Sequence, residues 1–379
     1  MKKTWMNISD VLFFQEGPGV RNTQYTTKGV KLLNVANLVD GKVDLTTSSR
    51  YISEEEAKGK YKHFLCDAGD FIIASSEIKV EYIDKKMGFI DESMLPLCMN
   101  TSTIRFKVLN EEQLRIRYFM YYLKSQDFKQ QLFKQITGSA QLNYGPSHLK
   151  KMMIPLIDIN EQDKMIARLD KIQDIVEMRK QEMDKLNNLI KARFVEMFGD
   201  ENNSKNWNIV NIEEVADVQV GVVIKPAQYY TDEEQGVRAF RSLNIGSGFV
   251  KDSDWVYFTE EGHQKNSKSI LKENDLLIVR SGAPGTACVV TKEYAGCNAI
   301  DIIIAHPDCQ KVNPYYLCIF TNMPHGKKQI DEGTGGAAQQ HFNVGKYNKM
   351  RLMLPPKELQ DEYVAFVHQV DKSKLEKER

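Results

Sequence analysis

The side chains best suited to chemistry in this chain are arginines, amides and hydroxyls that recur at matched positions. Arg241 and Asn244 stand three residues apart, and Asn34 and Asn37 keep that spacing about 200 residues earlier. A guanidinium donates two parallel hydrogen bonds to guanine, and an amide both donates to and accepts from adenine. These residue types favour recognition through hydrogen bonds, with base edges as one class of target.

Sequence signatures of catalysis are missing. The one Pro-Pro pair, Pro355-Pro356, lacks the preceding Asn or Asp and the following Tyr or Phe with which an amino-methyltransferase holds its target amine. The sequence has no Gly-x-x-x-x-Gly-Lys-Ser/Thr phosphate loop. Pro307-Asp308 is not followed at useful range by the Glu/Asp-x-Lys of a nuclease. We therefore expect a chain that is not itself an enzyme.

The cysteines and histidines do not predict a metal site. The 6 Cys and 7 His residues form no Cys-x-x-Cys, His-x-x-x-His or His-Glu-x-x-His motif, and a structural zinc site needs ligands clustered at such short spacings. We expect reduced and mostly buried thiols.

A long-period repeat positions the recurring side chains. Five pairs of segments keep their order at an offset of about 200 residues, which predicts two tandem copies of one module, each followed by a trailing segment. Gly17 and Gly221 follow the first pair at the same distance. The clearest pairs are 5–11 with 207–215, 29–38 with 236–245, 69–76 with 274–281, and 137–141 with 334–339.

Each module is expected to be α+β. Short β-branched and aromatic runs bounded by turn residues predict strands near 70–74, 102–106, 275–279 and 288–290. Helical stretches interrupt them near 114–123 and 315–321. We expect a twisted, largely antiparallel sheet in each module.

The trailing segments differ in kind from the modules. Apolar residues recur at steps of three and four across 161–198, with no Pro or Gly before Gly199. This heptad pattern predicts a long coiled-coil helix. Residues 359–379 begin with the same spacing and then become charged. We expect the two helices to pair antiparallel, the short one covering part of the long one. The alternative is that each packs only on its own module.

This order of parts resembles the specificity (S) subunit of type I restriction–modification systems over essentially the whole chain. Each module leaves through a Pro-containing exit that leads to a Gln and a helix, at 152–162 and 352–360. The string Phe-Val-Glu-Met-Phe-Gly-Asp at 194–200 and Val-Asp-Lys-Ser-Lys at 370–374 are also typical of that family. The final helix departs from the family pattern, because it is short and lacks a second Phe-Gly-Asp-like close.

The resemblance implies two tandem target-recognition domains joined by long helices in an antiparallel coiled coil with pseudo-twofold symmetry. The expected limits are 1–158 for the first domain, 159–200 for the central helix, 201–357 for the second domain and 358–379 for the distal helix. Each domain would read one half of a split, asymmetric site in double-stranded DNA, and the helices would set the spacing.

The resemblance also implies partners that carry the chemistry. Two modification (methyltransferase) subunits would dock on the helices and methylate adenine with S-adenosylmethionine. Restriction (translocase and nuclease) subunits would add ATP-driven cleavage. On this interpretation the chain binds no cofactor, and S-adenosylmethionine, Mg²⁺ and ATP belong to the partners.

Candidate DNA contacts follow from side-chain type and from position in the repeat. Gly-rich strings bring backbone amides close to phosphate, and Gln or Asn beside them can read a base. In the first module the candidates are Asn34, Asn37, Lys60, Lys62, Ser75, Ser76, Lys79, Ser139, Gln141 and Asn143. In the second they are Arg238, Arg241, Asn244, Lys265, Arg280, Ser281, Gln339 and Gln340. Since Asn34 is matched by Arg241 and Ser75 by Arg280, the two modules should read different sequences.

The charge balance qualifies the DNA hypothesis. The chain of 379 residues carries 51 basic and 51 acidic groups. Residues 1–158 hold 22 basic and 18 acidic groups, whereas residues 201–357 hold 17 and 18. A near-neutral second module leaves open a different class of protein, a non-DNA adaptor with two binding modules on a helical spacer. No apolar run approaches the ~20 residues that span a bilayer, so we expect a soluble cytoplasmic protein without a membrane partner.

Overall fold

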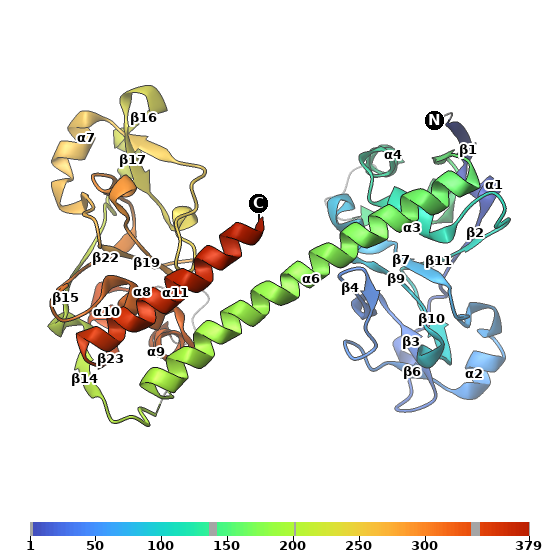
Figure 1. The fold of residues 1–379 in the computed structure, drawn as a ribbon. Helices are drawn as coiled ribbons and strands as arrows, with labels where there is room; N and C mark the ends of the chain where they lie inside the picture. The colour runs from blue at the N-terminus through green and yellow to red at the C-terminus, as the bar shows by residue number, and fades with distance from the viewer. Residues whose placement is uncertain (1–2, 136–141, 201, 335–341, 379) are drawn as a thin grey trace. The chain divides into compact units, whose positions relative to one another are not determined.

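The computed structural model describes residues 3–135, 142–200, 202–334 and 342–378. It divides into two compact units, Met1–Glu177 and Met178–Arg379, whose boundary falls inside the long helix α6 (Ile159–Phe198). Both units contain a four-stranded sheet, a second sheet with one parallel pair, and a two-stranded pair that joins the start of the unit to the strand before its last helix (Figure 1). The internal repeat inferred from the sequence is therefore a repeat of fold.

The first unit is built on an antiparallel four-stranded sheet in the order β2-β11-β7-β9. All four residues of β7 are buried: Phe71 and Ile73 enter one apolar cluster, and Ile72 and Ala74 enter another. Because successive side chains of a strand point to opposite faces, this sheet must be covered on both sides. Its strands are β2 (Leu12–Glu16), β7 (Phe71–Ala74), β9 (Met87–Phe89) and β11 (Thr103–Val108).

A second sheet of this unit has the order β10-β3-β6. Its β3–β10 pair is parallel, which the sequence analysis did not anticipate. Parallel neighbours need a long crossover connection, and here the chain passes through β7 and β9 between them. The strands are β3 (Val30–Leu33), β6 (Tyr51–Ile52) and β10 (Leu97–Met99), with two-stranded pairs formed by β1 (Thr4–Asn7) and β13 (Met153–Leu156), β4 (Leu38–Val39) and β5 (Lys42–Val43), and β8 (Ser76–Ile78) and β12 (Leu142–Asn143).

The second unit repeats this plan. An antiparallel sheet has the order β15-β22-β19-β20, and a second sheet, β16-β18-β17-β21, again contains one parallel pair, β17–β21. The strands are β14 (Asn208–Asn211), β15 (Ala216–Val220), β16 (Tyr230–Thr231), β17 (Val237–Phe240), β18 (Val256–Phe258), β19 (Leu276–Val279), β20 (Ala287–Val289), β21 (Asn298–Ala299), β22 (Ile302–Pro307) and β23 (Arg351–Leu354).

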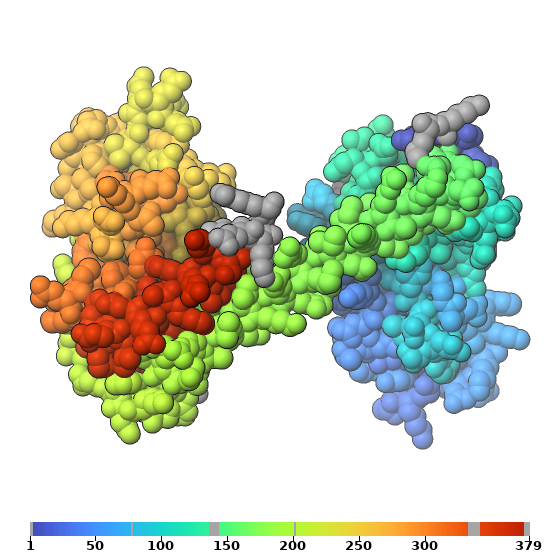
Figure 2. All heavy atoms as spheres, viewed as in Figure 1, coloured from blue at the N-terminus to red at the C-terminus, as the bar shows by residue number. Residues whose placement is uncertain are grey.

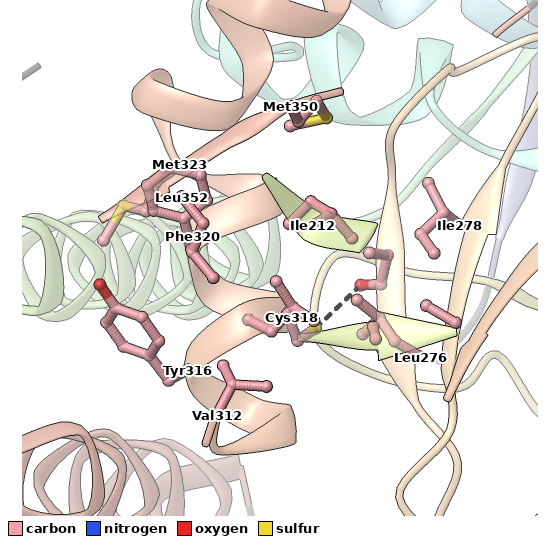
Figure 3. Packing of buried hydrophobic residues seen from close by; sticks show 14 of the residues in the cluster. Ile212, Leu276, Ile278, Val312, Tyr316, Cys318, Phe320, Met323, Met350 and Leu352 are labelled. Atoms are coloured by element: carbon pink, nitrogen blue, oxygen red, sulfur yellow. Dashed lines mark hydrogen bonds between the residues drawn. The ribbon is translucent and has the colours of Figure 1, made fainter. Parts of the chain in front are cut away.

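Helices cover one face of each four-stranded sheet. In the second unit Tyr316 and Phe320 of α8 pack in one cluster with Leu276 and Ile278 of β19, and the Cys318 thiol donates to the Ala287 carbonyl at 3.4 Å (Figure 3). The short and medium helices are α1 (Ile8–Val11), α2 (Glu54–Lys58), α3 (Ile116–Leu123), α4 (Gln126–Gln135) and α5 (Pro146–Leu149) in the first unit, and α7 (Glu260–Lys265), α8 (Pro314–Asn322), α9 (Pro324–Thr334) and α10 (Val344–Asn348) in the second.

The long helix α6 is anchored at both ends by different contacts. In the first unit Asp163 pairs with Arg115 at 2.8 Å, and Asp170 accepts from Arg117 at 2.7 Å. The Arg115 guanidinium lowers the pKa of the Asp163 carboxyl. In the second unit Phe194 is buried in the core. The middle of the helix, residues 171–181, is exposed throughout.

The distal helix α11 (Lys357–Glu378) pairs with the C-terminal part of α6, as expected (Figure 2). Glu362 accepts from Arg193 at 3.1 Å, the Tyr363 hydroxyl donates to the Ile190 carbonyl at 3.0 Å, and further along α11 a lysine donates to Asn187. Residue numbers rise along α11 as they fall along α6, so the pair is antiparallel and covers part of the long helix.

Candidate nucleic-acid interface

In the second unit the fold gathers several strand ends at one place. Strand β17 ends at Phe240 and β19 ends at Val279, and both pair with the segment that enters β22. The amide of the residue before Asp301 donates to the Phe240 carbonyl at 2.8 Å. Arg241 follows β17, Arg280 follows β19, and Asp301 precedes β22. We term Arg241, Arg280 and Asp301 the strand-end cluster.

The Arg280 side chain is fixed by a carboxylate. Its Nη1 group donates to Oδ1 of Asp301. The Arg280 side chain is 17% exposed and that of Asp301 is 46% exposed. Phe342, the first described residue after 335–341, donates its amide to the Arg280 carbonyl at 3.0 Å. The Gly-rich string predicted to approach DNA therefore rejoins the described chain beside this arginine.

Two more arginines of the second unit are half-buried and held in place. Arg241 donates through Nη2 to the backbone carbonyl of Asp254. The Arg238 guanidinium lies 5.5 Å from the centroid of the Trp255 ring and 3.8 Å from Asp252. A planar cation over an indole ring gains electrostatic attraction while its hydrogen-bonding edge stays usable.

The equivalent place in the first unit carries neutral side chains at the matched positions. Asn34 stands where the second unit has Arg241, and its Oδ1 accepts from Asn100 at 2.8 Å. Ser75 stands where the second unit has Arg280, and its hydroxyl donates to Glu16 at 3.1 Å. The Tyr144 amide donates to the Ser75 carbonyl at 3.0 Å, as Phe342 does at Arg280. The geometry is repeated but the side-chain chemistry is not.

Four of the predicted DNA contacts have side chains that are buried and bonded internally: Asn34, Asn37, Ser75 and Asn244. Asn37 accepts the amide hydrogen of Asn34 at 3.0 Å, and Asn244 accepts that of Arg241 at 2.9 Å, each closing a matched 3-10 turn. In this structure these side chains therefore support the local backbone, and their contact with DNA stays a prediction.

The structure places the other predicted residues as follows. Lys60, Lys62, Lys79 and Lys265 are exposed, and Lys265 pairs with Glu261 at 2.5 Å. Ser76 and Ser281 are half-buried. The backbone of Asn143 belongs to β12 and pairs with that of Ser76. Ser139, Gln141, Gln339 and Gln340 lie outside the described residues. All of these remain predictions.

Sequence reasoning missed Asp301 and two apolar residues, Val223 and Ile224. Asp301 heads the apolar run of β22, and nothing in that run marks it as the partner of an arginine 21 residues earlier. Val223 and Ile224 are exposed large apolar side chains just after Gly221. Gly221 could have indicated that this segment passes close to another backbone segment. A Cβ at this position would lie 2.3 Å from the Ala299 carbonyl oxygen, so only glycine fits there.

The described residues contain no group of three or more His, Cys, Asp or Glu side chains able to hold a metal ion. All six cysteines are free, and only Cys309 is exposed, in agreement with the expectation of reduced and mostly buried thiols. Burial raises the pKa of Cys66 and of Cys288 to about 12. These thiols are therefore neutral near pH 7 and are neither nucleophiles nor metal ligands in that state.

Exposed apolar side chains also occur on the middle of α6. Ile172 and Val176 continue the heptad pattern of this helix and are 56% and 63% exposed. In the first unit they border a hollow of about 420 Å³ that is also lined by Tyr121, Lys124 and Leu169. Exposed apolar side chains at heptad spacing are typical of a helix that receives a partner.

Among the described residues, no helix is both long enough and apolar enough to cross a bilayer.

Comparison with known proteins identifies the family. The model of the type I restriction modification DNA specificity domain matches residues 8–188 and again 204–379. The chain belongs to this family, with two copies of the domain. Their limits differ slightly from the two compact units because the first match runs on along α6.

Individual relatives are distant. The specificity subunit of the type I restriction enzyme MjaVIII from Methanocaldococcus jannaschii is 25% identical over 181 residues, which is 48% of this chain and 42% of that protein. The match thus spans less than half of that relative's length. The type I restriction-modification S subunit of M. genitalium has a TM-score of 0.56 at 14% identity, covering 99% of this chain and 91% of that one.

A second solved structure, described in a study of complex assembly and conformational transition of the type I R-M system, has a TM-score of 0.53 at 15% identity. It covers 98% of this chain and 91% of that chain. At these identities the structures establish the shared fold of two α+β units with long helices.

Proposed function

We propose that this chain is the DNA sequence-recognition subunit of a type I restriction–modification complex, and that each unit reads one half of a bipartite, asymmetric site in double-stranded DNA. The observation that carries the proposal is the repeated strand-end site with different side chains: Arg241 and Arg280 in one unit, Asn34 and Ser75 in the other. Two copies of one scaffold with unlike chemistry fit a target with two unlike halves.

The helices complete the proposal. The exposed middle of α6 spaces the two half-sites and receives two modification subunits, and restriction subunits join that assembly in the cytoplasm. The chain itself is not catalytic. Adenine methylation with S-adenosylmethionine, and cleavage with ATP and Mg²⁺, belong to the partner subunits. The neutral total charge supports a division of labour in which this chain supplies selectivity and its partners much of the phosphate affinity.

Selection of bound duplexes from a random pool tests this function. The full-length chain, purified with any methyltransferase subunit that accompanies it, should enrich two unlike half-sites at a fixed separation. A palindromic site would contradict two unlike readers. Binding should also fall steeply between about 50 and 200 mM salt, because phosphate contacts release counterions. Salt-independent binding to a protein partner, without DNA binding, would instead support the two-module adaptor.

A further inference from the structure

We infer that the half-site read by the second unit contains a guanine recognised by Arg280, and that Asp301 positions the arginine for this contact. The inference rests on the proposed DNA-recognition function and specifies the chemistry of one of its two readers. It makes Arg280 a specificity-determining residue and Asp301 a positioning residue that the sequence did not reveal.

The Arg280 side chain is restrained before any ligand binds. An arginine side chain normally loses ~2 kcal/mol of rotamer entropy when it is ordered. Here that ordering is present before any ligand binds, because Asp301 holds Nη1 of Arg280 while most of the side chain is buried. The carboxylate is itself anchored at the start of the buried strand β22. A guanidinium ordered in advance binds a planar target with less entropic cost.

The guanidinium of Arg280 keeps donors that Asp301 does not use. Asp301 takes one Nη1 hydrogen, and in the described part of the chain the structure gives Nη2 of Arg280 no hydrogen-bond acceptor. We take the Nη1 hydrogen bonded by Asp301 to be the one that points away from Nη2, which leaves one donor on each nitrogen of the Nη1–Nη2 edge. In the major groove guanine presents two neighbouring acceptors, O6 and N7, which match two parallel donors. Adenine presents one acceptor and one donor there, so the same edge would meet a like group.

The backbone of Arg280 is fixed as well as its side chain. Arg280 follows β19, which pairs with β22, and its carbonyl accepts the amide hydrogen of Phe342 at 3.0 Å. The first unit has Ser75 at the matched position, with its hydroxyl bonded to Glu16, so it lacks this guanine-reading fork at the matched site.

The test compares base preferences of Arg280→Lys and Arg280→Ala with those of the unaltered protein, in the same random-pool selection. Lysine keeps the charge but loses the bidentate fork. We expect Arg280→Lys to retain overall DNA affinity within a few-fold and to lose about tenfold or more of its preference for guanine at one position of one half-site. The other half-site serves as the internal control, and Arg351→Ala, an exposed arginine on β23, controls for the loss of one positive charge.

A second variant isolates the positioning role. Asp301 has φ 49°, which asparagine tolerates, so Asp301→Asn should fold. Removing a negative charge beside DNA should leave total affinity unchanged or higher, while the preference for guanine falls. A residue important only for folding would lower stability and affinity together and leave the base preference intact.

The outcomes distinguish failure of the guanine inference from failure of the proposed DNA-recognition function. If the protein selects two unlike half-sites and neither Arg280 variant changes a guanine position, the inference is wrong and the proposed function stands. If the protein selects no DNA sequence, both fail. Loss of guanine at one position in Arg280→Lys and in Asp301→Asn, with the other half-site and Arg351→Ala unchanged, supports the inference.

Discussion

At the scale of the residue, matched positions of the repeat separate into shared supports and divergent readers. Gln162 and Gln360 are both fully buried, and each is the fourth residue of a long helix, α6 or α11. Asn34 and Arg241, in contrast, share a backbone position but differ in charge and reach. Residues that satisfy buried backbone groups cannot change without loss of stability, whereas the buried Asn34 and the half-buried Arg241 precede matched 3-10 turns with different side chains.

The buried glutamines provide the residue-scale prediction. Gln162 accepts the Arg115 amide hydrogen at 3.0 Å and donates to the carbonyls of Gln113 at 2.9 Å and Ile157 at 3.0 Å. Gln162→Ala would leave three backbone groups without this partner. We expect a loss of about 2–4 kcal/mol in the free energy of unfolding of the first unit, measured by urea denaturation.

Gln173→Ala is the matched control for that experiment. Gln173 is an exposed residue on the same helix and accepts a hydrogen bond from the half-buried Lys124 at 3.2 Å. Its replacement should change the free energy of unfolding by less than about 0.5 kcal/mol. Equal effects of the two variants would show that the buried amide is not a structural support. In the second unit, Gln360 accepts the Asn313 amide hydrogen at 2.8 Å, so Gln360→Ala should destabilise that unit similarly.

At the scale of the element, local patterns predicted more than long-range pairing. The strands expected near 70–74 and 275–279 are β7 and β19, and the helix expected from heptads is α6. These elements could be predicted because their burial and periodicity depend on residues that are adjacent in the sequence. The parallel pairs and the Arg280–Asp301 contact depend on the register between segments far apart in sequence. No local pattern encodes that register, and the burial of Asn37 and Asn244 was not foreseen for the same reason.

The exposed stretch of α6 carries the element-scale prediction. Glutamate in place of both Ile172 and Val176 would put charge where an apolar partner surface is expected to pack, and burying an unpaired charge is costly. We expect co-purification of modification subunits to fall about tenfold or more, while circular dichroism of the isolated chain is unchanged. Ala167→Glu, exposed on another face of the same helix, should leave co-purification intact. Equal loss in both variants, or in neither, would contradict docking through this heptad face.

At the scale of the whole molecule, one continuous helix belongs to both compact units. Its start is fixed by contacts to α3 in the first unit and its end by the core and α11 in the second, while residues 171–181 between them are exposed. An insertion after Glu177 leaves the contacts of Arg115 with the start of the helix and the burial of Phe194 near its end in place. This makes the helix a testable spacer, independent of the residues that read DNA.

Insertion of one additional heptad after Glu177, by duplicating residues 171–177, preserves the apolar spacing of α6 and lengthens it by about 10 Å. If the helix sets the separation of the half-sites, the selected DNA spacer should grow by about two to three base pairs, since base pairs rise ~3.4 Å each. Both half-site sequences should stay the same, because neither strand-end site is altered. Seven inserted Gly and Ser residues at the same point should instead blur the preferred spacing, since such a segment is flexible. An unchanged spacer in the heptad variant, with both half-sites still selected, would show that α6 does not measure the distance between them.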